Sequence, residues 1–136
     1  FNDAQRISVG LAGVDEFRLS ADALQSKIES QNVYFNCTTV DYTENQSLKI
    51  SEWVKDLESL TKTAKNWQVE IQGQADFSGT PATNAEISQK RADKILAELL
   101  KSDKLKDVRQ SIKSTGVSTT KDAECKVNIN VNLTER

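Results

Sequence analysis

Residues 74–96 read QADFSGTPATNAEISQKRADKIL and hold the most informative pattern in the chain. At the start of this segment, in QVEIQGQA (residues 68–75), apolar and polar residues alternate, which predicts a strand buried on one face. A loop containing Gly79 and Pro81 follows. From about Asn84 to Leu100 apolar residues recur at helical spacing, which predicts an amphipathic helix. The segment therefore predicts a strand, a loop and a helix in direct succession.

The rest of the sequence extends this pattern into a two-layer fold. CKVNINVNL (residues 125–133) and VYFNCTTV (residues 33–40) alternate like strands, and a weaker strand is predicted around Ser111 to Thr115. Helical spacing predicts helices from about Asn45 to Ala64 and from Ser20 to Gln31. Strands separated by helices favour an α+β two-layer sandwich, a βαβαβ(β) sheet with the helices on one face. The first two strands, which a helix connects, should run parallel.

The predicted elements divide the chain into two parts. We expect residues 1–32 to form a linker with an additional N-terminal helix, and residues 33–136 to form one compact domain. The helix from Asn45 to Ala64 is expected to bury one stripe, made of Leu48, Trp53, Leu57, Leu60 and Ala64.

The composition fits one globular domain and argues against some classes of partner. The 136 residues are 37% hydrophobic and 28% charged, and the net charge of -2 argues against a nucleic-acid partner, which needs a basic surface. No apolar stretch is long enough to span a bilayer and no signal-peptide pattern is present. We therefore expect any membrane anchor to lie before Phe1, and this fragment itself to make no membrane contact.

The absence of histidine excludes several enzyme mechanisms. Without His the chain cannot form a Ser-His-Asp triad, a Cys-His dyad or a histidine-based zinc site. The two cysteines, Cys37 and Cys125, stand too far apart to form a CxxC motif. Catalysis would have to depend on carboxylate, Lys, Tyr or Ser chemistry.

An acidic and a basic residue flank the loop of the central segment. Asp76 lies just past the predicted strand, and Arg91 lies about two turns into the following helix. A loop that folds back would let the two side chains face each other across a small concave site. Such a site suits a zwitterion, with a ligand ammonium on Asp76 and a ligand carboxylate held bidentate by Arg91. The simpler alternative is a surface ion pair, worth less than about 1 kcal/mol.

The spacing D-x2-G-x4-N-x3-S-x2-R-A resembles the signature of the OmpA-like peptidoglycan-binding domain. Its six positions here are Asp76, Gly79, Asn84, Ser88, Arg91 and Ala92. The resemblance extends over about residues 33–133, from the Phe35-Asn36 strand to the closing strand. It implies non-catalytic binding of the Gram-negative cell wall, with no cofactor and no metal.

The resemblance also implies a role for each site residue. In that family the Asp and the Arg hold the diaminopimelate residue of the stem peptide. Carried over to this chain, Asp76 would take the ligand ammonium and Arg91 the ligand carboxylate. Asn84 would order the loop or contact the ligand, and Gly79 and Ser88 complete the implied site.

The chain departs from the family pattern next to this site. Ala75 stands where the family usually has Thr, and Thr83 stands in place of an aromatic residue. Before the last strand, Glu124, Cys125 and Lys126 replace Asn-Arg-Arg. We therefore expect a weaker or more conditional binder than a typical member.

Domains of this family occur on porins, on wall-associated lipoproteins and on MotB-type stator subunits of inner-membrane complexes. The predicted helix from Ser20 to Gln31 looks more like the stator type, which includes accessory subunits of secretion systems. This implies a periplasmic domain tethered to the inner membrane by a segment before Phe1, acting as a homodimer or with a partner membrane subunit.

Two other functions stay open. The first is a degenerate OmpA-like module that dimerises or docks on another protein without binding the wall. The second is a carboxylate-based wall hydrolase. Asp76 with Asp93 or Glu86 supports it poorly as an acid-base pair, because helix-surface carboxylates are normally solvated.

Cys37 and Cys125 are expected on the inward faces of neighbouring strands. They could be buried free thiols that pack as small hydrophobes. A periplasmic location would instead favour a disulfide between them.

Overall fold

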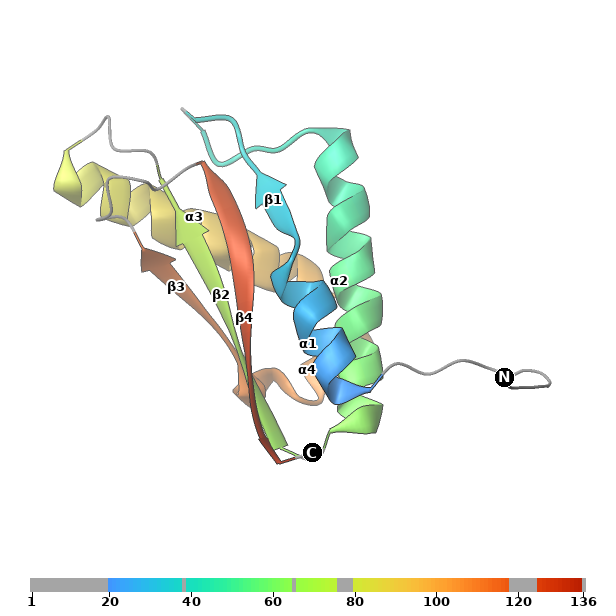
Figure 1. Cartoon of the computed structure of the whole chain (residues 1–136). Coiled ribbons are helices and arrows are strands. Elements are labelled where there is room, and N and C mark those ends of the chain that lie inside the picture. The colour runs from blue at the N-terminus through green and yellow to red at the C-terminus, as the bar shows by residue number, and fades with distance from the viewer. Residues whose placement is uncertain (1–19, 38, 65, 76–79, 118–124, 136) are drawn as a thin grey trace.

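The computed structural model describes residues 20–135, apart from residues 38, 65, 76–79 and 118–124. The elements in chain order are α1 (Ala21–Glu29), β1 (Asn32–Tyr34), α2 (Glu44–Thr63), β2 (Asn66–Gln74), α3 (Pro81–Leu99), α4 (Asp103–Lys106), η1 (Arg109–Ser111), β3 (Ile112–Val117) and β4 (Lys126–Glu135). The strands form one four-stranded sheet, and the long helices pack against one of its faces (Figure 1). This arrangement confirms the predicted α+β two-layer sandwich.

The sheet has the order β1-β4-β2-β3. Strands β2 and β3 pair in parallel, and β4 runs antiparallel to both of its neighbours, β1 and β2. Strands β1 and β2 therefore run in the same direction, as their helical connection predicted. They are not paired with each other, because the last strand of the chain lies between them.

The core lies between the sheet and the helices. Alternate residues of β2 and β4 point into it, and Val69 and Ile71 stand opposite Val131 and Ile129. Both tryptophans belong to this core, since Trp53 is 0% and Trp67 is 6% exposed. The helices contribute Ala21, Leu24, Ile28, Ile50, Trp53, Leu57, Leu60, Ala92, Ile95 and Leu99.

The predicted stripe of α2 was wrong at one position. Leu48 is 70% exposed, and Ile50 is buried in its place. The step from Leu48 to Trp53 is five residues, which carries Leu48 well away from the stripe at 3.6 residues per turn.

The first strand is shorter than predicted. β1 covers Asn32–Tyr34 instead of residues 33–40, and Cys37 is exposed in a turn rather than on an inward strand face. Phe35 still donates its N–H to the Cys125 carbonyl at 2.7 Å, but the next N–H, of Asn36, donates to Asp41 O at 2.9 Å. The chain therefore turns on itself immediately after Phe35.

Helix α1 follows the predicted pattern and joins the main core. Its N-cap Ser20 accepts a hydrogen bond from Ala23 N at 3.1 Å. The indole N–H of Trp53 on α2 donates to the Ile28 carbonyl at 3.1 Å near the other end of the helix. The proposed boundary between residues 1–32 and 33–136 stays a prediction, although α1 shares a core with the rest of the fold.

Helix α3 begins earlier than its apolar spacing predicted. Its N-cap is Thr80, whose hydroxyl accepts from Thr83 N at 3.1 Å, and Pro81 occupies the first turn. Proline is favoured there because its fixed φ suits a helix and its missing N–H would have had no intrahelical partner. The predicted start at Asn84 is therefore about one turn late.

Candidate functional site

Two glycines bring α3 very close to the sheet. Gly73 of β2 and Gly116 of β3 are paired in register. A Cβ atom added at Gly73 would lie 1.9 Å from Ser88 O, and one added at Gly116 would lie 2.6 Å from Ser88 Oγ. Ser88 is itself completely buried, and its hydroxyl donates to Ala85 O at 2.9 Å. This close contact sets the distance between α3 and the end of β2.

Arg91 lies less than one turn further along α3 and is completely buried. Its guanidinium donates to four backbone carbonyls. Nη1 donates to Gln74 O at 2.8 Å, and Nε donates to Thr39 O at 3.2 Å. Nη2 contacts three carbonyl oxygens, those of Asn36 at 2.9 Å, Cys37 at 3.2 Å and Thr39 at 2.9 Å. These carbonyl dipoles compensate the burial of a full positive charge, which would otherwise be strongly unfavourable.

A second cation of α3 holds the same stretch of backbone, residues 35–41, which we call the Cys37 turn. Lys94 donates to Val40 O at 3.0 Å and pairs with Asp41 Oδ1 at 3.4 Å. On the other side, a disulfide joins Cys37 to Cys125, next to the start of β4. The Cys37 turn is therefore fixed to α3 by two cations and to the sheet by a covalent bond.

The structure places three of the five predicted site residues. Asn84, Ser88 and Arg91 follow one another on the buried face of α3, with 5%, 0% and 0% exposed area. Asp76 and Gly79 lie outside the described residues, so the predicted approach of Asp76 to Arg91 stays a prediction. The first described contact of Arg91 with β2 is nevertheless at Gln74, only two residues before Asp76.

No pattern in the sequence pointed to the carbonyl partners of Arg91. Every residue carries a backbone carbonyl, so composition and spacing cannot single out those of Asn36, Cys37 and Thr39. Lys94, one turn away from Arg91 on α3, was also missed. Lys94 lies three residues after Arg91, and residues at that spacing share a helix face. This spacing is the one sequence feature that could have identified Lys94.

The Arg91 guanidinium already contacts four backbone carbonyls. An anionic ligand would therefore either replace some of these carbonyls or bind beside them. A ligand carboxylate that reaches Arg91 would meet a guanidinium already fixed in position, which lowers the entropic cost of binding. Among the described residues no group of three or more Cys, Asp and Glu side chains could hold a metal ion. None of the helices in the described part of the chain is long and apolar enough to cross a bilayer.

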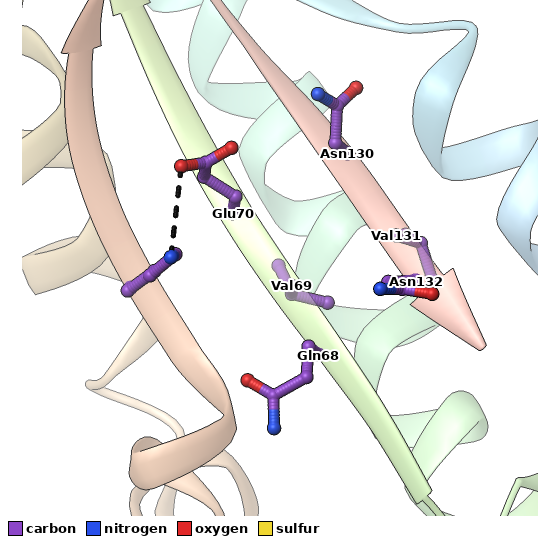
Figure 2. Close-up of a pocket in the computed structure, with 7 residues that line it drawn as sticks. Gln68, Val69, Glu70, Asn130, Val131 and Asn132 are labelled. Atoms are coloured by element: carbon purple, nitrogen blue, oxygen red, sulfur yellow. Dashed lines mark ion pairs between the residues drawn. The ribbon is translucent and has the colours of Figure 1, made fainter. Parts of the chain in front are cut away.

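The uncovered face of the sheet carries a second, polar surface. A shallow hollow there is lined by Gln68, Val69, Glu70, Lys113, Asn130, Val131 and Asn132 (Figure 2). Glu70 lies 4.0 Å from Lys113 Nζ and also accepts from Thr115 at 3.0 Å and from Gln72 at 2.9 Å. Asn128 bridges Gln72 and Gln74 across the strands. Much of this face is therefore engaged in its own hydrogen bonds.

The strand order and the helix that follows β2 define the class of fold, which is the OmpA-like fold. The C-terminal domain of MotB from Helicobacter pylori is similar, with a TM-score of 0.60 at 15% identity over 75% of this chain and 84% of that one. The peptidoglycan-associated lipoprotein of Burkholderia pseudomallei gives 0.58 at 17% identity, over 75% of this chain and 90% of that one. The OmpA-like domain of FopA1 from Francisella tularensis gives 0.51 at 15% identity, over 77% and 73%.

The likeness is one of fold. No protein-family model matches the sequence, and no curated protein is significantly similar to it. The roles predicted for the signature residues Asp76 to Ala92 are therefore not tested by these comparisons.

Proposed function

We propose that this domain binds peptidoglycan without catalysis and anchors an envelope complex to the cell wall. The observation that carries the proposal is Arg91, a buried and fixed cation of α3 that donates to the carbonyl of Gln74, the last residue of β2 and two residues before Asp76 in the sequence. A solved structure with the same fold is described as a peptidoglycan-associated lipoprotein, which supports wall association in general.

The ligand in this proposal is the diaminopimelate residue of the stem peptide. Its side-chain ammonium would be held by Asp76 and its carboxylate by Arg91. Gly79 would allow the loop between them to turn, and Asn84 in the first turn of α3 would order that loop or contact the ligand. Ser88 contributes indirectly, because its small side chain lets α3 pack onto Gly73 and Gly116.

The proposed setting is the periplasm. Similar solved structures include the periplasmic domain of Helicobacter pylori MotB, which supports an envelope location. We propose a tether to the inner membrane through a segment before Phe1, as in a stator-like subunit of an ion-driven or secretion complex. The partners would then be peptidoglycan and either a second copy of the chain or a membrane subunit.

A sacculus pull-down tests the proposal. Purified diaminopimelate-type sacculi should retain the wild-type domain at neutral pH, and Asp76→Asn should lose most of this binding. Binding should also fall as the pH approaches the ordinary carboxyl pKa of about 4, because Asp76 must be ionised to hold an ammonium. Glu86→Gln is the matched control, since Glu86 is an exposed carboxylate of α3 whose ion-pair partner in the described part of the chain is Lys90, at 3.3 Å.

The test of Arg91 needs a more conservative substitution than alanine. Removing its guanidinium would take a charged donor away from four backbone carbonyls, so Arg91→Ala would damage the fold as well as the site. Arg91→Lys keeps the charge but cannot reproduce these contacts, and circular dichroism must show that it is folded. Wild-type retention by Asp76→Asn and by a folded Arg91→Lys variant would contradict the site.

The occupied guanidinium also favours a second candidate. If Arg91 serves only to hold the Cys37 turn, the domain is a protein-interaction or dimerisation module with an OmpA-like fold. That function predicts a concentration-dependent mass in sedimentation equilibrium, with no sacculus binding at any pH.

A further inference from the structure

We infer that the Cys37–Cys125 disulfide is a positioning element of the wall-binding site, and that the domain binds its ligand tightly only in the oxidised state. The inference rests on the proposed function, because it concerns the arginine assigned to the ligand carboxylate. It starts from the position of the disulfide, which closes the Cys37 turn that surrounds Arg91.

Cys37 has two roles in the same place. Its carbonyl accepts from Arg91 Nη2 at 3.2 Å, and its sulfur is bonded to that of Cys125. The carbonyls on either side in the turn, of Asn36 and Thr39, accept from the same nitrogen at 2.9 Å each. Three of the four carbonyls around the guanidinium therefore belong to the segment that the disulfide fastens to the sheet.

Among the described residues, few other contacts join this turn to the sheet. β1 ends at Tyr34, so the ladder with β4 stops before Cys37, apart from the bond from Phe35 N to Cys125 O. Cys37 is exposed and makes no contribution to the hydrophobic core. Inside the turn, Asn36 N donates to Asp41 O at 2.9 Å and Thr39 N donates to Asn36 O at 3.3 Å, and these bonds do not involve the sheet. In the described residues the disulfide is thus the covalent link between Cys37 and the sheet, and it acts together with the contacts of the turn to Arg91 and Lys94.

Reduction should loosen the turn without unfolding the domain. A dithiol attacks the disulfide from the exposed Cys37 side, and Cys37 and Cys125 each gain one electron and one proton as the reagent becomes a disulfide. The carbonyls then lose their fixed positions, and a buried guanidinium without fixed acceptors is unfavourable. Arg91 would move toward solvent, and the preorganised cation at the end of β2 would be lost.

Two readouts on the whole chain test this inference. The first is the affinity for diaminopimelate-type sacculi, measured with and without a dithiol reductant. The second needs no ligand and follows the exchange rate of the Arg91 Nε–H by nitrogen-15 NMR. A Cys37→Ser/Cys125→Ser double variant is the matched control, because it cannot form the disulfide and therefore cannot respond to the reductant.

We expect reduction to weaken sacculus binding about tenfold or more and to speed Nε–H exchange by a similar factor. The double variant should match the reduced wild type in both readouts and ignore the reductant. Far-UV circular dichroism should remain that of a folded protein throughout.

The outcomes separate the two proposals. Unchanged Nε–H exchange after reduction, or unchanged affinity in a reduced and folded protein, would overturn the inference. Absence of binding by the oxidised wild type would instead contradict the wall-binding function, and faster exchange on reduction would then still support the disulfide as the element that positions Arg91.

Discussion

At Gly73 the missing side chain allows a helix to lie directly on a strand. The virtual Cβ at this position would lie 1.9 Å from Ser88 O and 2.8 Å from Ala92 N, which are backbone atoms that cannot move alone. Ser88 and Ala92 are small and fully buried, so they complete the close contact from the helix side. These three residues therefore set the distance between α3 and the sheet, and with it the position of Arg91.

Gly73→Ala should lower the free energy of unfolding by about 3 kcal/mol, because α3 must shift away from β2 to admit the methyl group. Urea unfolding followed by circular dichroism measures the change. Because Arg91 would move with α3, sacculus binding should fall as well. An unchanged unfolding midpoint would contradict the close contact between α3 and the sheet.

Asn84, Ser88 and Arg91 of the predicted signature all lie on the buried face of α3. The sequence favoured a bidentate grip by Arg91 on a ligand, whereas the described contacts of Arg91 are with four backbone carbonyls. Those partners come from a turn 52 to 55 residues away in sequence, apart from Gln74. A long-range backbone contact of this kind depends on the tertiary fold and leaves no local pattern.

On the scale of elements, α1 completes an edge that β1 leaves open. β1 pairs with only three residues of β4, Lys126 to Asn128. Further along β4, Glu29 Oε2 accepts from Val131 N at 2.8 Å, and Gln25 Nε2 donates to Val131 O at 2.7 Å. Side chains of α1 thus replace a strand neighbour, which protects β4 from pairing with another chain.

Glu29→Ala should destabilise the domain by about 1–2 kcal/mol, since it leaves the Val131 N–H without its charged acceptor. Alanine has a high helix propensity, so a loss cannot come from weakening α1 itself. Thermal unfolding against Ser26→Ala, an exposed position on the same helix, measures the difference. Equal stability of the two variants would mean that α1 does not cover the β4 edge.

The element predictions succeeded where the pattern was long and periodic. The observed α2 (Glu44–Thr63), β2 (Asn66–Gln74) and β4 (Lys126–Glu135) lie within about two residues of the expected bounds, because each buries one regular face. The prediction for β1 was wrong at its end, since alternation continues through Cys37 although the backbone turns after Phe35. The place of β4 between β1 and β2 could not be read from any segment alone, because it depends on which strands pair.

On the scale of the whole molecule, two groups in the described part of the chain make the stability depend on alkaline pH. Lys27 lies 3.0 Å from the buried Asp56, and this hydrogen bond raises the pKa of Lys27 above 10.5. Burial raises the pKa of Tyr42 above 10.0. Both groups bind their proton more tightly in the folded state, so their contribution is complete below these ordinary values and is lost as the pH rises through the higher folded values.

The free energy of unfolding should therefore fall above about pH 10. Urea titrations at several alkaline pH values measure it, and Tyr42→Phe should show a shallower fall because one of the two groups no longer titrates. A stability that rises over this range, or an unchanged slope in Tyr42→Phe, would contradict the assignment of these groups.

The most direct test of wall recognition compares two stem peptides that differ at one carboxylate. Diaminopimelate offers an ammonium and a carboxylate at its far end, whereas lysine at the same place offers the ammonium alone. Calorimetric titration of the oxidised domain should show diaminopimelate peptide binding at least about tenfold more tightly, because only that ligand engages Arg91 as well as Asp76. Equal affinity for the two peptides, or binding of neither, would contradict a site built on Asp76 and Arg91.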